Sequence, residues 1–244
     1  MSCLFAFRKL LSGLLSFFAL AFVGSLNACQ TATELPDSGY GYQPLEKANF
    51  WIYEVTEQRF ALNGTSTTQT YQWRETIVQV YTDSTVRSLP EGRVYRLERY
   101  RRASDSQPWQ PDSVSSLRIT DNQLIKNENN ISYAKLVFPV VDQFQWNGNA
   151  YNAIGEDLYQ FRNPGKPFTV LNQPFAETVT VVQQNDSTLV SQDKRLEIYA
   201  RQVGLIYKEK VQLQFCSSTP SCVGKAQIDF GIRQSIRLRS YGRE

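Results

Sequence analysis

The chain of 244 residues contains no histidine, and its single methionine is Met1. Without histidine it lacks the commonest general base, the Ser-His-Asp and Cys-His catalytic groups, and the commonest metal ligand. Its four cysteines include no C-x-x-C pair, so neither a redox motif nor a zinc cluster is present. No P-loop, dinucleotide fingerprint, Gly-x-Ser-x-Gly elbow or EF-hand loop occurs. We therefore expect a protein that is not an enzyme and that holds no metal or cofactor.

The net charge of the chain is also small. The chain has 26 Lys+Arg against 23 Asp+Glu, but residues 1–28 contain Arg8, Lys9 and no acid. Without that segment, 24 basic side chains face 23 acidic ones. A nearly neutral protein has no long-range field to steer it to nucleic acid, and we expect no nucleic-acid partner.

The first 28 residues have the order of a secretory signal, with a basic start, an apolar run from Leu10 to Val23, and small residues before a cysteine. Leu26-Asn27-Ala28-Cys29 resembles a lipobox, the motif at which bacterial lipoproteins are cleaved and acylated. The resemblance implies lipidation of Cys29 and attachment to a membrane through acyl chains. An uncleaved anchor stays open as an alternative, because Leu10 to Ala28 is 19 residues long and a bilayer span takes about 20. Plain secretion is the other alternative, although it would not need Cys29.

The residues after Cys29 indicate a destination. The position after it is Gln30, not aspartate, which resembles lipoproteins released to the outer membrane. No acidic cluster of the kind that marks surface export follows, so a periplasm-facing protein is expected. The stretch from Gln30 to Tyr42 is polar and rich in turn residues, which is typical of a tether. The sequence thus predicts a signal peptide over 1–28, a lipid-anchored tether over 29–42, and one domain over 43–244.

Within that domain, apolar and polar residues alternate with period two, as in half-buried antiparallel strands. The clearest case runs from Ile228 to Leu238, where Ile228, Phe230 and Ile236 are expected on the buried face. Turn residues such as Asn163-Pro164-Gly165 are expected to separate strands. Strands are predicted over residues 51–56, 71–81, 93–103, 113–120, 123–127, 132–138, 175–184, 205–215 and 228–239.

Long strands of this kind favour an all-β fold with a single antiparallel, strongly curved sheet, either a barrel or a half-barrel meander. A sandwich is the second choice. One short helix is expected over residues 194–201. Thirteen Tyr, fourteen Phe and four Trp suit a packed β core, and they also suit the wall of an apolar cavity.

Cys216 and Cys222 flank Ser-Ser-Thr-Pro-Ser between two strongly alternating runs. A hairpin at this place brings its strand ends within disulfide range, and an oxidising periplasm closes the bridge. A metal site or a redox pair is the weaker alternative, because two thiols with C-x5-C spacing fit neither. We predict a structural disulfide.

Three local patterns carry weak signals of chemistry. Glu156-Asp157 lies among aromatic residues and offers the two acids that a glycan hydrolase needs, although neighbours on a strand point to opposite faces. Ser191-Gln192-Asp193-Lys194 has the bare spacing of a Ser–Lys hydrolase, on a predicted loop without companion motifs. Arginines crowd the segment from Arg93 to Arg102, with Tyr95 and Tyr100 between them. Cross-strand ion pairs and a solvated face explain that crowding better than nucleic-acid binding.

Two segments resemble uncharacterised lipoproteins of the Gram-negative envelope. These are Tyr42-Gln43-Pro44-Leu45 through Trp51-Ile52-Tyr53-Glu54-Val55, and Tyr199-Ala200-Arg201-Gln202-Val203-Gly204-Leu205-Ile206-Tyr207-Lys208-Glu209. The resemblance implies a turn at Gly204 and an all-β periplasmic domain, and it implies no catalytic residue.

Three hypotheses of function follow. The favoured one is a non-enzymatic outer-membrane lipoprotein that acts as a scaffold or accessory subunit in an envelope complex. The alternative is a carrier that binds a lipid or other apolar molecule inside the curved sheet. A carboxylate-only glycan hydrolase is a distant third. A filled core with an exposed apolar patch would favour the scaffold, a deep apolar cavity the carrier, and a cleft with two facing acids the hydrolase.

Overall fold

The computed structural model describes residues 38–62, 64–82 and 92–244. This part of the chain contains twelve strands and one short 3-10 helix, η1, at Tyr40–Tyr42. No helix within it is long and apolar enough to cross a bilayer. The strands are β1 (Asn49–Phe60), β2 (Ser66–Thr82), β3 (Arg93–Arg102), β4 (Gln110–Thr120), β5 (Gln123–Glu128), β6 (Ile131–Val137), β7 (Gln145–Asn147), β8 (Leu158–Val170), β9 (Gln173–Ser187), β10 (Ser191–Ala200), β11 (Gly204–Phe215) and β12 (Ile228–Arg243).

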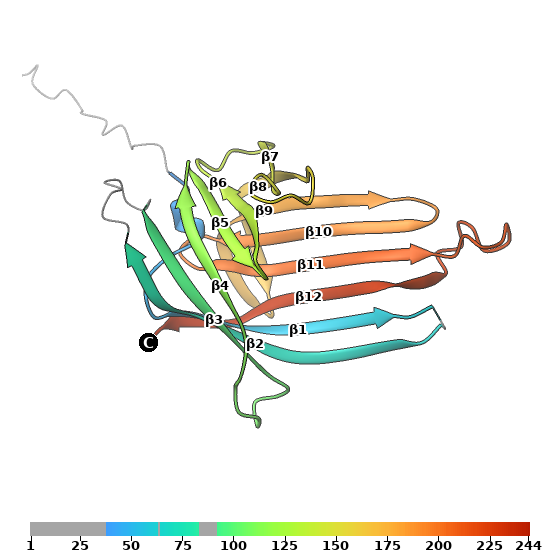
Figure 1. Cartoon of the computed structure of the whole chain (residues 1–244), viewed down its shortest axis with the longest axis horizontal. Coiled ribbons are helices and arrows are strands. Elements are labelled where there is room, and N and C mark those ends of the chain that lie inside the picture. The colour runs from blue at the N-terminus through green and yellow to red at the C-terminus, as the bar shows by residue number, and fades with distance from the viewer. Residues whose placement is uncertain (1–37, 63, 83–91) are drawn as a thin grey trace, which may run out of the picture. The chain divides into compact units, whose positions relative to one another are not determined.

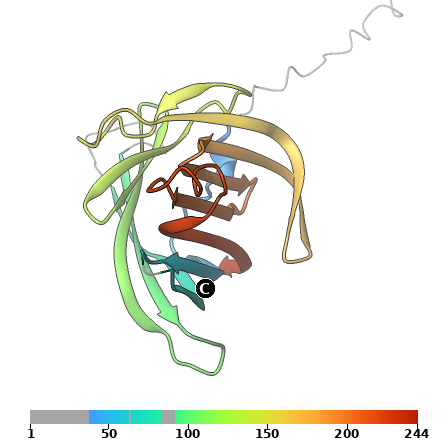
Figure 2. The same ribbon diagram turned by 90° about the vertical axis from the view of Figure 1, so that its right-hand side faces the viewer.

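All twelve strands form one antiparallel sheet in the order β6-β5-β4-β3-β2-β1-β12-β11-β10-β9-β8-β7. The chain starts at the centre of the sheet, runs outward to β6, crosses to β7, and returns strand by strand to β12 beside β1. The sheet curls strongly around its inner face (Figure 1, Figure 2). This confirms the prediction of an all-β fold with one strongly curved antiparallel sheet.

The two edges of the sheet meet at a seam between β6 and β7. The amide of Ala134 in β6 donates to the carbonyl oxygen of Gly148, which directly follows β7, at 2.9 Å. The indole Nε1 of Trp146 in β7 donates to the carbonyl oxygen of Ala134 at 2.8 Å. These bonds satisfy backbone groups that an open edge would leave unpaired, so the sheet is nearly closed into a barrel.

Alternation along the strands produces the core. Inward-pointing apolar side chains from opposite walls pack together, and the most deeply buried are 0–2% exposed. Five of them are Val55, Ile77, Leu97, Phe161 and Leu238. The period-two pattern of the sequence therefore locates the inner face of the barrel correctly for much of the sheet.

The structure corrects several details of the sequence prediction. Residues 194–201 form strand β10 and not a helix, because β9 and β11 pair with this segment on both sides and override its local propensity. Residues 163–165 lie inside β8, where they form an irregularity in the pairing with β9 and do not end the strand. Phe230 is 45% exposed, although Ile236 in the same strand is buried as predicted.

The fold begins before the expected end of the tether. Tyr42 is only 4% exposed, and the ring of Tyr40 packs on Phe138 with their centroids 4.5 Å apart. Helix η1 and residues 38–42 are therefore part of the folded domain. The predicted signal peptide, the predicted lipidation site Cys29 and the predicted tether as far as residue 37 lie outside the described residues.

The two segments that resemble envelope lipoproteins contact each other. Trp51 Nε1 donates to the carbonyl oxygen of Val203 at 2.6 Å, and the Tyr53 hydroxyl donates to that of Leu205 at 3.1 Å. Gly204, between these two carbonyls, has φ +102°, a conformation that favours glycine. A side chain there would also approach Trp51 Nε1 at 3.3 Å, so the turn and the tryptophan fit together.

Cys216 and Cys222 form a disulfide between β11 and β12, with Cα atoms 5.6 Å apart. Both side chains are buried, at 6% and 9% exposure. The bridge fixes the loop that joins the two strands at one end of the sheet.

Replacing both cysteines by serine is expected to lower the free energy of unfolding by about 2–3 kcal/mol, because the bridge limits the freedom of the unfolded chain. Urea unfolding of the two proteins under oxidising conditions measures the difference. The wild type in reductant should match the double variant. An unchanged midpoint would contradict a stabilising role for the bridge.

Candidate functional site: a charged cavity in the barrel

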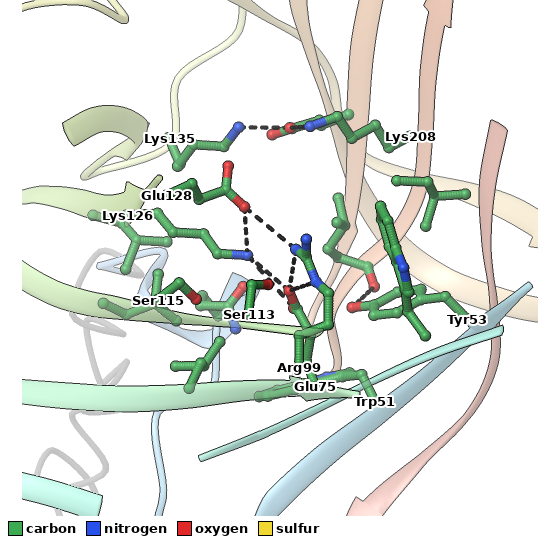
Figure 3. A pocket seen from close by; sticks show the side chains of 18 of the residues that line it. Trp51, Tyr53, Glu75, Arg99, Ser113, Ser115, Lys126, Glu128, Lys135 and Lys208 are labelled. Atoms are coloured by element: carbon green, nitrogen blue, oxygen red, sulfur yellow. Dashed lines mark hydrogen bonds and ion pairs between the residues drawn. The ribbon is translucent and has the colours of Figure 1, made fainter. Parts of the chain in front are cut away.

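A cavity of about 180 Å³ lies inside the barrel. Apolar side chains such as Leu97, Leu124 and Ile236 line part of it, and Ser113 and Ser115 of β4 add hydroxyl groups. Seven charged side chains from β2, β3, β5, β6, β10 and β11 complete the wall. They are Glu75, Arg99, Lys126, Glu128, Lys135, Glu197 and Lys208. Figure 3 shows those of Glu75, Arg99, Lys126, Glu128, Lys135 and Lys208.

The first group of charges lies on the N-terminal half of the sheet. Glu75 in β2 and Arg99 in β3 are direct cross-strand partners, joined at 2.5 Å. Lys126 and Glu128 lie two residues apart in β5 and so share a face. Lys126 contacts Glu75 at 3.2 Å and Glu128 at 3.0 Å. This group has two cations and two carboxylates and is neutral.

The second group joins β6, at one edge of the sheet, to β10 and β11 in the other half of the sheet. Glu197 in β10 is the register partner of Lys208 in β11, with their charged atoms 3.0 Å apart. Lys135 in β6 approaches the same carboxylate at 2.6 Å, and the hydroxyl of Tyr199 donates to it at 2.7 Å. One carboxylate therefore serves two ammonium groups.

Lys135 reaches the cavity because of a bulge. Leu124 in β5 pairs with Leu136, but Ile125 pairs with Ala134, so Lys135 is the extra residue. A bulge of this kind redirects a side chain and bends its strand. Ala134, Lys135 and Leu136 are consecutive and are all buried, at 0%, 6% and 0% exposure.

The pKa values follow from burial and from neighbouring charges. Burial raises the pKa of Glu197, but Lys135, Lys208 and the hydrogen bonds it accepts outweigh that effect and lower the pKa to about 2. Burial lowers the pKa of Lys135 below its ordinary value in spite of Glu197. The pKa of Lys208 is raised, because Glu197 and Glu128 outweigh its burial. Lys135 is the more enclosed of the two lysines, with 7% of its side chain exposed against 26%.

The carboxylates of the cavity are held ionised. Burial opposes ionisation of Glu75 and Glu128, but the nearby cations prevail and lower both pKa values. A general acid in glycoside hydrolysis needs a raised pKa, so these side chains suit ion pairing better than proton donation.

The acid pair and the Ser–Lys pair suggested by the sequence do not form sites. Glu156 is exposed, whereas Asp157 accepts from Arg195 at 2.7 Å. Ser191 bonds to Thr188 at the start of β10, which is a strand and not the predicted loop. Lys194 pairs with Glu209 at 2.9 Å, so Ser191 and Lys194 are engaged separately.

The arginines of β3 divide between the two faces. Arg96 pairs with Glu98 at 2.9 Å, as expected of a solvated face. Arg99 instead lines the cavity and stacks over Trp73, with its guanidinium carbon 4.2 Å from the ring centroid. Arg101 lies 3.8 Å over the ring of Tyr71. Each of these three arginine side chains therefore already contacts a partner within the chain.

Sequence reasoning did not identify the charged cavity. The signal for Arg99 was present, because alternation places it on the same face as the buried Tyr95 and Leu97. No such signal exists for Lys135, whose orientation depends on the bulge. Among the described residues, no group of three or more His, Cys, Asp or Glu side chains is arranged to hold a metal ion.

No protein-family model and no curated protein matches the chain. Two solved structures share a distant likeness of fold, each covering 82% of this chain and 98% of its own. One is a "putative exported protein with YmcC-like fold" from Bacteroides fragilis, with 10% identity and a TM-score of 0.41. The other is a "putative lipoprotein" from Parabacteroides distasonis, with 11% identity and a TM-score of 0.42.

Proposed function

We propose that this protein is a non-enzymatic lipoprotein of the outer membrane, facing the periplasm, that binds a small polar ligand inside its barrel. The observation that carries the proposal is the cavity of about 180 Å³ with seven charged side chains in its wall. Charged side chains are rarely buried unless they are paired or serve a site, and this cluster surrounds an open volume. Acyl chains on Cys29, which the signal segment over residues 1–28 precedes, supply the membrane attachment.

The lining favours a polar ligand over the apolar one that a lipid carrier needs. An apolar molecule in this cavity would strip water from charged groups without replacing its hydrogen bonds, which costs free energy. The volume is close to that of an engineered cavity of about 150 Å³ that holds benzene, so an entire diacyl lipid is too large. The cavity also favours a binding protein over a scaffold, for which a filled core was the expectation.

The test is native mass spectrometry of the protein extracted from its membrane with the lipid anchor intact. We expect a bound small molecule on the wild type. Ser115→Trp fills the cavity from the wall of β4 and should abolish the adduct. The neighbouring Ser116→Trp does not enter the cavity and should keep it. Wild-type protein without an adduct, or an adduct that survives Ser115→Trp, would contradict the proposal.

A further inference from the structure

The cavity contains more positive than negative charge. Four cations and three carboxylates line it, and the surplus lies in the group formed by Lys135, Glu197 and Lys208. We propose that the ligand is a small molecule carrying an oxyanion, a carboxylate or phosphate group, which binds beside Lys135 and Lys208. The inference rests on the proposed function and names the chemical class of its ligand.

The carboxylates of the cavity already accept hydrogen bonds and ion pairs from several donors. Glu197 accepts from Lys135, Lys208 and Tyr199. Glu75 accepts from Arg99 and Lys126. Each lysine ammonium carries three donors, so the two lysines that share Glu197 keep donors for another acceptor. A ligand that adds acceptors and negative charge complements this wall, whereas a cation would add to the surplus.

A second donor points to the same class of ligand. The indole Nε1 of Trp73, which lines the cavity, is buried and has no hydrogen-bond acceptor within the described part of the chain. Indole is a donor only, and a buried donor without an acceptor costs about 1–3 kcal/mol. A ligand rich in acceptors would satisfy this donor, whereas a cationic ligand would not.

The positive field continues along β11 beyond the cavity. Lys210 lies two residues after Lys208 and forms no ion pair with any described residue. Burial lowers the pKa of Lys210, and the positive charges of Lys208, Arg195 and Arg59 lower it further. The carboxylate of Asp193 raises it, but by less. Lys210 therefore adds a basic side chain without an ion-pair partner close to Lys208 on the same strand.

The geometry also defines the size and position of the ligand. Lys135 and Lys208 extend from opposite walls toward the same space (Figure 3). The volume admits a molecule about the size of benzene with its charged group between the lysines. Leu97, Leu124 and Ile236 offer an apolar surface for its body. A free metabolite fits this description, and so does the phosphate headgroup of a lipid whose chains stay outside.

Isothermal titration of the whole lipoprotein in detergent, at fixed ionic strength, tests the class of ligand. The probes are benzoate, its uncharged isostere benzamide, and inorganic phosphate, with chloride as the reference. We expect benzoate to bind roughly ten- to a hundredfold more tightly than benzamide, the gain typical of hydrogen bonds to charged groups. Lys208→Gln should remove most of this preference, and Lys225→Gln, in the exposed disulfide loop, should leave it intact.

The outcomes separate this inference from the proposed function. Equal binding of benzoate and benzamide, or no oxyanion bound more tightly than chloride, overturns the anion class. A neutral or cationic adduct in native mass spectrometry also overturns it, while the binding function survives. An empty protein that binds no probe defeats both. An anionic adduct supports the inference, and its mass distinguishes a free small molecule from a lipid. A thermal melt of Lys208→Gln shows whether the variant is folded.

Discussion

Replacing Glu197 with glutamine is expected to lower the free energy of unfolding by about 3–5 kcal/mol. Glu197 is 1% exposed and holds the ammonium groups of Lys135 and Lys208 at 2.6 Å and 3.0 Å. Removing its charge leaves the buried Lys135 and the partly buried Lys208 without their nearest counter-ion, and that desolvation cost dominates the result. Because the three residues join β6, β10 and β11, the loss falls on the packing between opposite walls of the barrel. Urea denaturation measures it.

Lys135→Met is the matched control for this prediction. It removes one of the two cations, fills a similar volume, and leaves Glu197 paired with Lys208. No charge is left uncompensated, so the loss should stay below about 1.5 kcal/mol. The asymmetry between the two variants is the expected result. Equal losses would mean that the charges act independently and that two lysines do not depend on one carboxylate.

The pH dependence of stability should also show that the ionised Glu197 stabilises the fold. The folded-state pKa of Glu197 is about 2, against an ordinary value of 4.5. Its contribution is therefore fully present above pH 4.5 and is lost as the pH falls through about 2, an effect of about 3 kcal/mol. Glu75 and Glu128 have lowered pKa values and titrate in the same acidic direction. The difference between wild type and Glu197→Gln isolates Glu197, and it should shrink toward pH 2.

The fold class was predictable because alternation is a local property. In β12, the spacing of Ile236 and Leu238 is enough to identify a strand with one buried face. The pattern in β10 was less informative, because its first six residues are half-buried and its last four, Glu197 to Ala200, are all buried, so burial does not alternate along the strand. Its helix-forming residues then suggested a helix, which only the adjacent strands exclude. Residues 163–165 were predicted as a turn for a related reason. Asparagine and glycine are common both in turns and in irregularities within a strand, and here they form an irregularity inside β8.

The site was less predictable than the fold because it is assembled from distant strands. Glu197 and Lys135 are 62 residues apart, and no local pattern indicates their ion pair. Their meeting requires the sheet to curl until β6 faces β10. The bulge at Lys135 must also turn that side chain inward. The sequence supplied the correct face for Arg99, and the charged character of the cavity followed only from the closed sheet.

Gly231→Ala is expected to lower the free energy of unfolding by about 3 kcal/mol or more. Gly231 lies in β12, opposite Leu213 in β11 and Phe60 in β1. Its φ of +140° favours glycine, and a Cβ atom there would lie 2.2 Å from the carbonyl oxygen of Gln212 and 2.8 Å from the Cα of Leu213. These neighbours are backbone atoms of a central strand, which cannot move aside as a flexible side chain can.

Gly155→Ala separates the two causes of that loss. Gly155 also has a positive φ, +108°, but a Cβ atom there meets nothing within 4 Å. It should therefore cost only the backbone strain, about 1 kcal/mol. Urea midpoints of both variants measure the difference, with an unchanged m-value as the sign that only stability has altered. Equal losses would refute the close approach of β12 to β11. A much larger loss at Gly231 would show that the β11 backbone leaves no room for a Cβ atom at the place where β12 joins the C-terminal strands to β1.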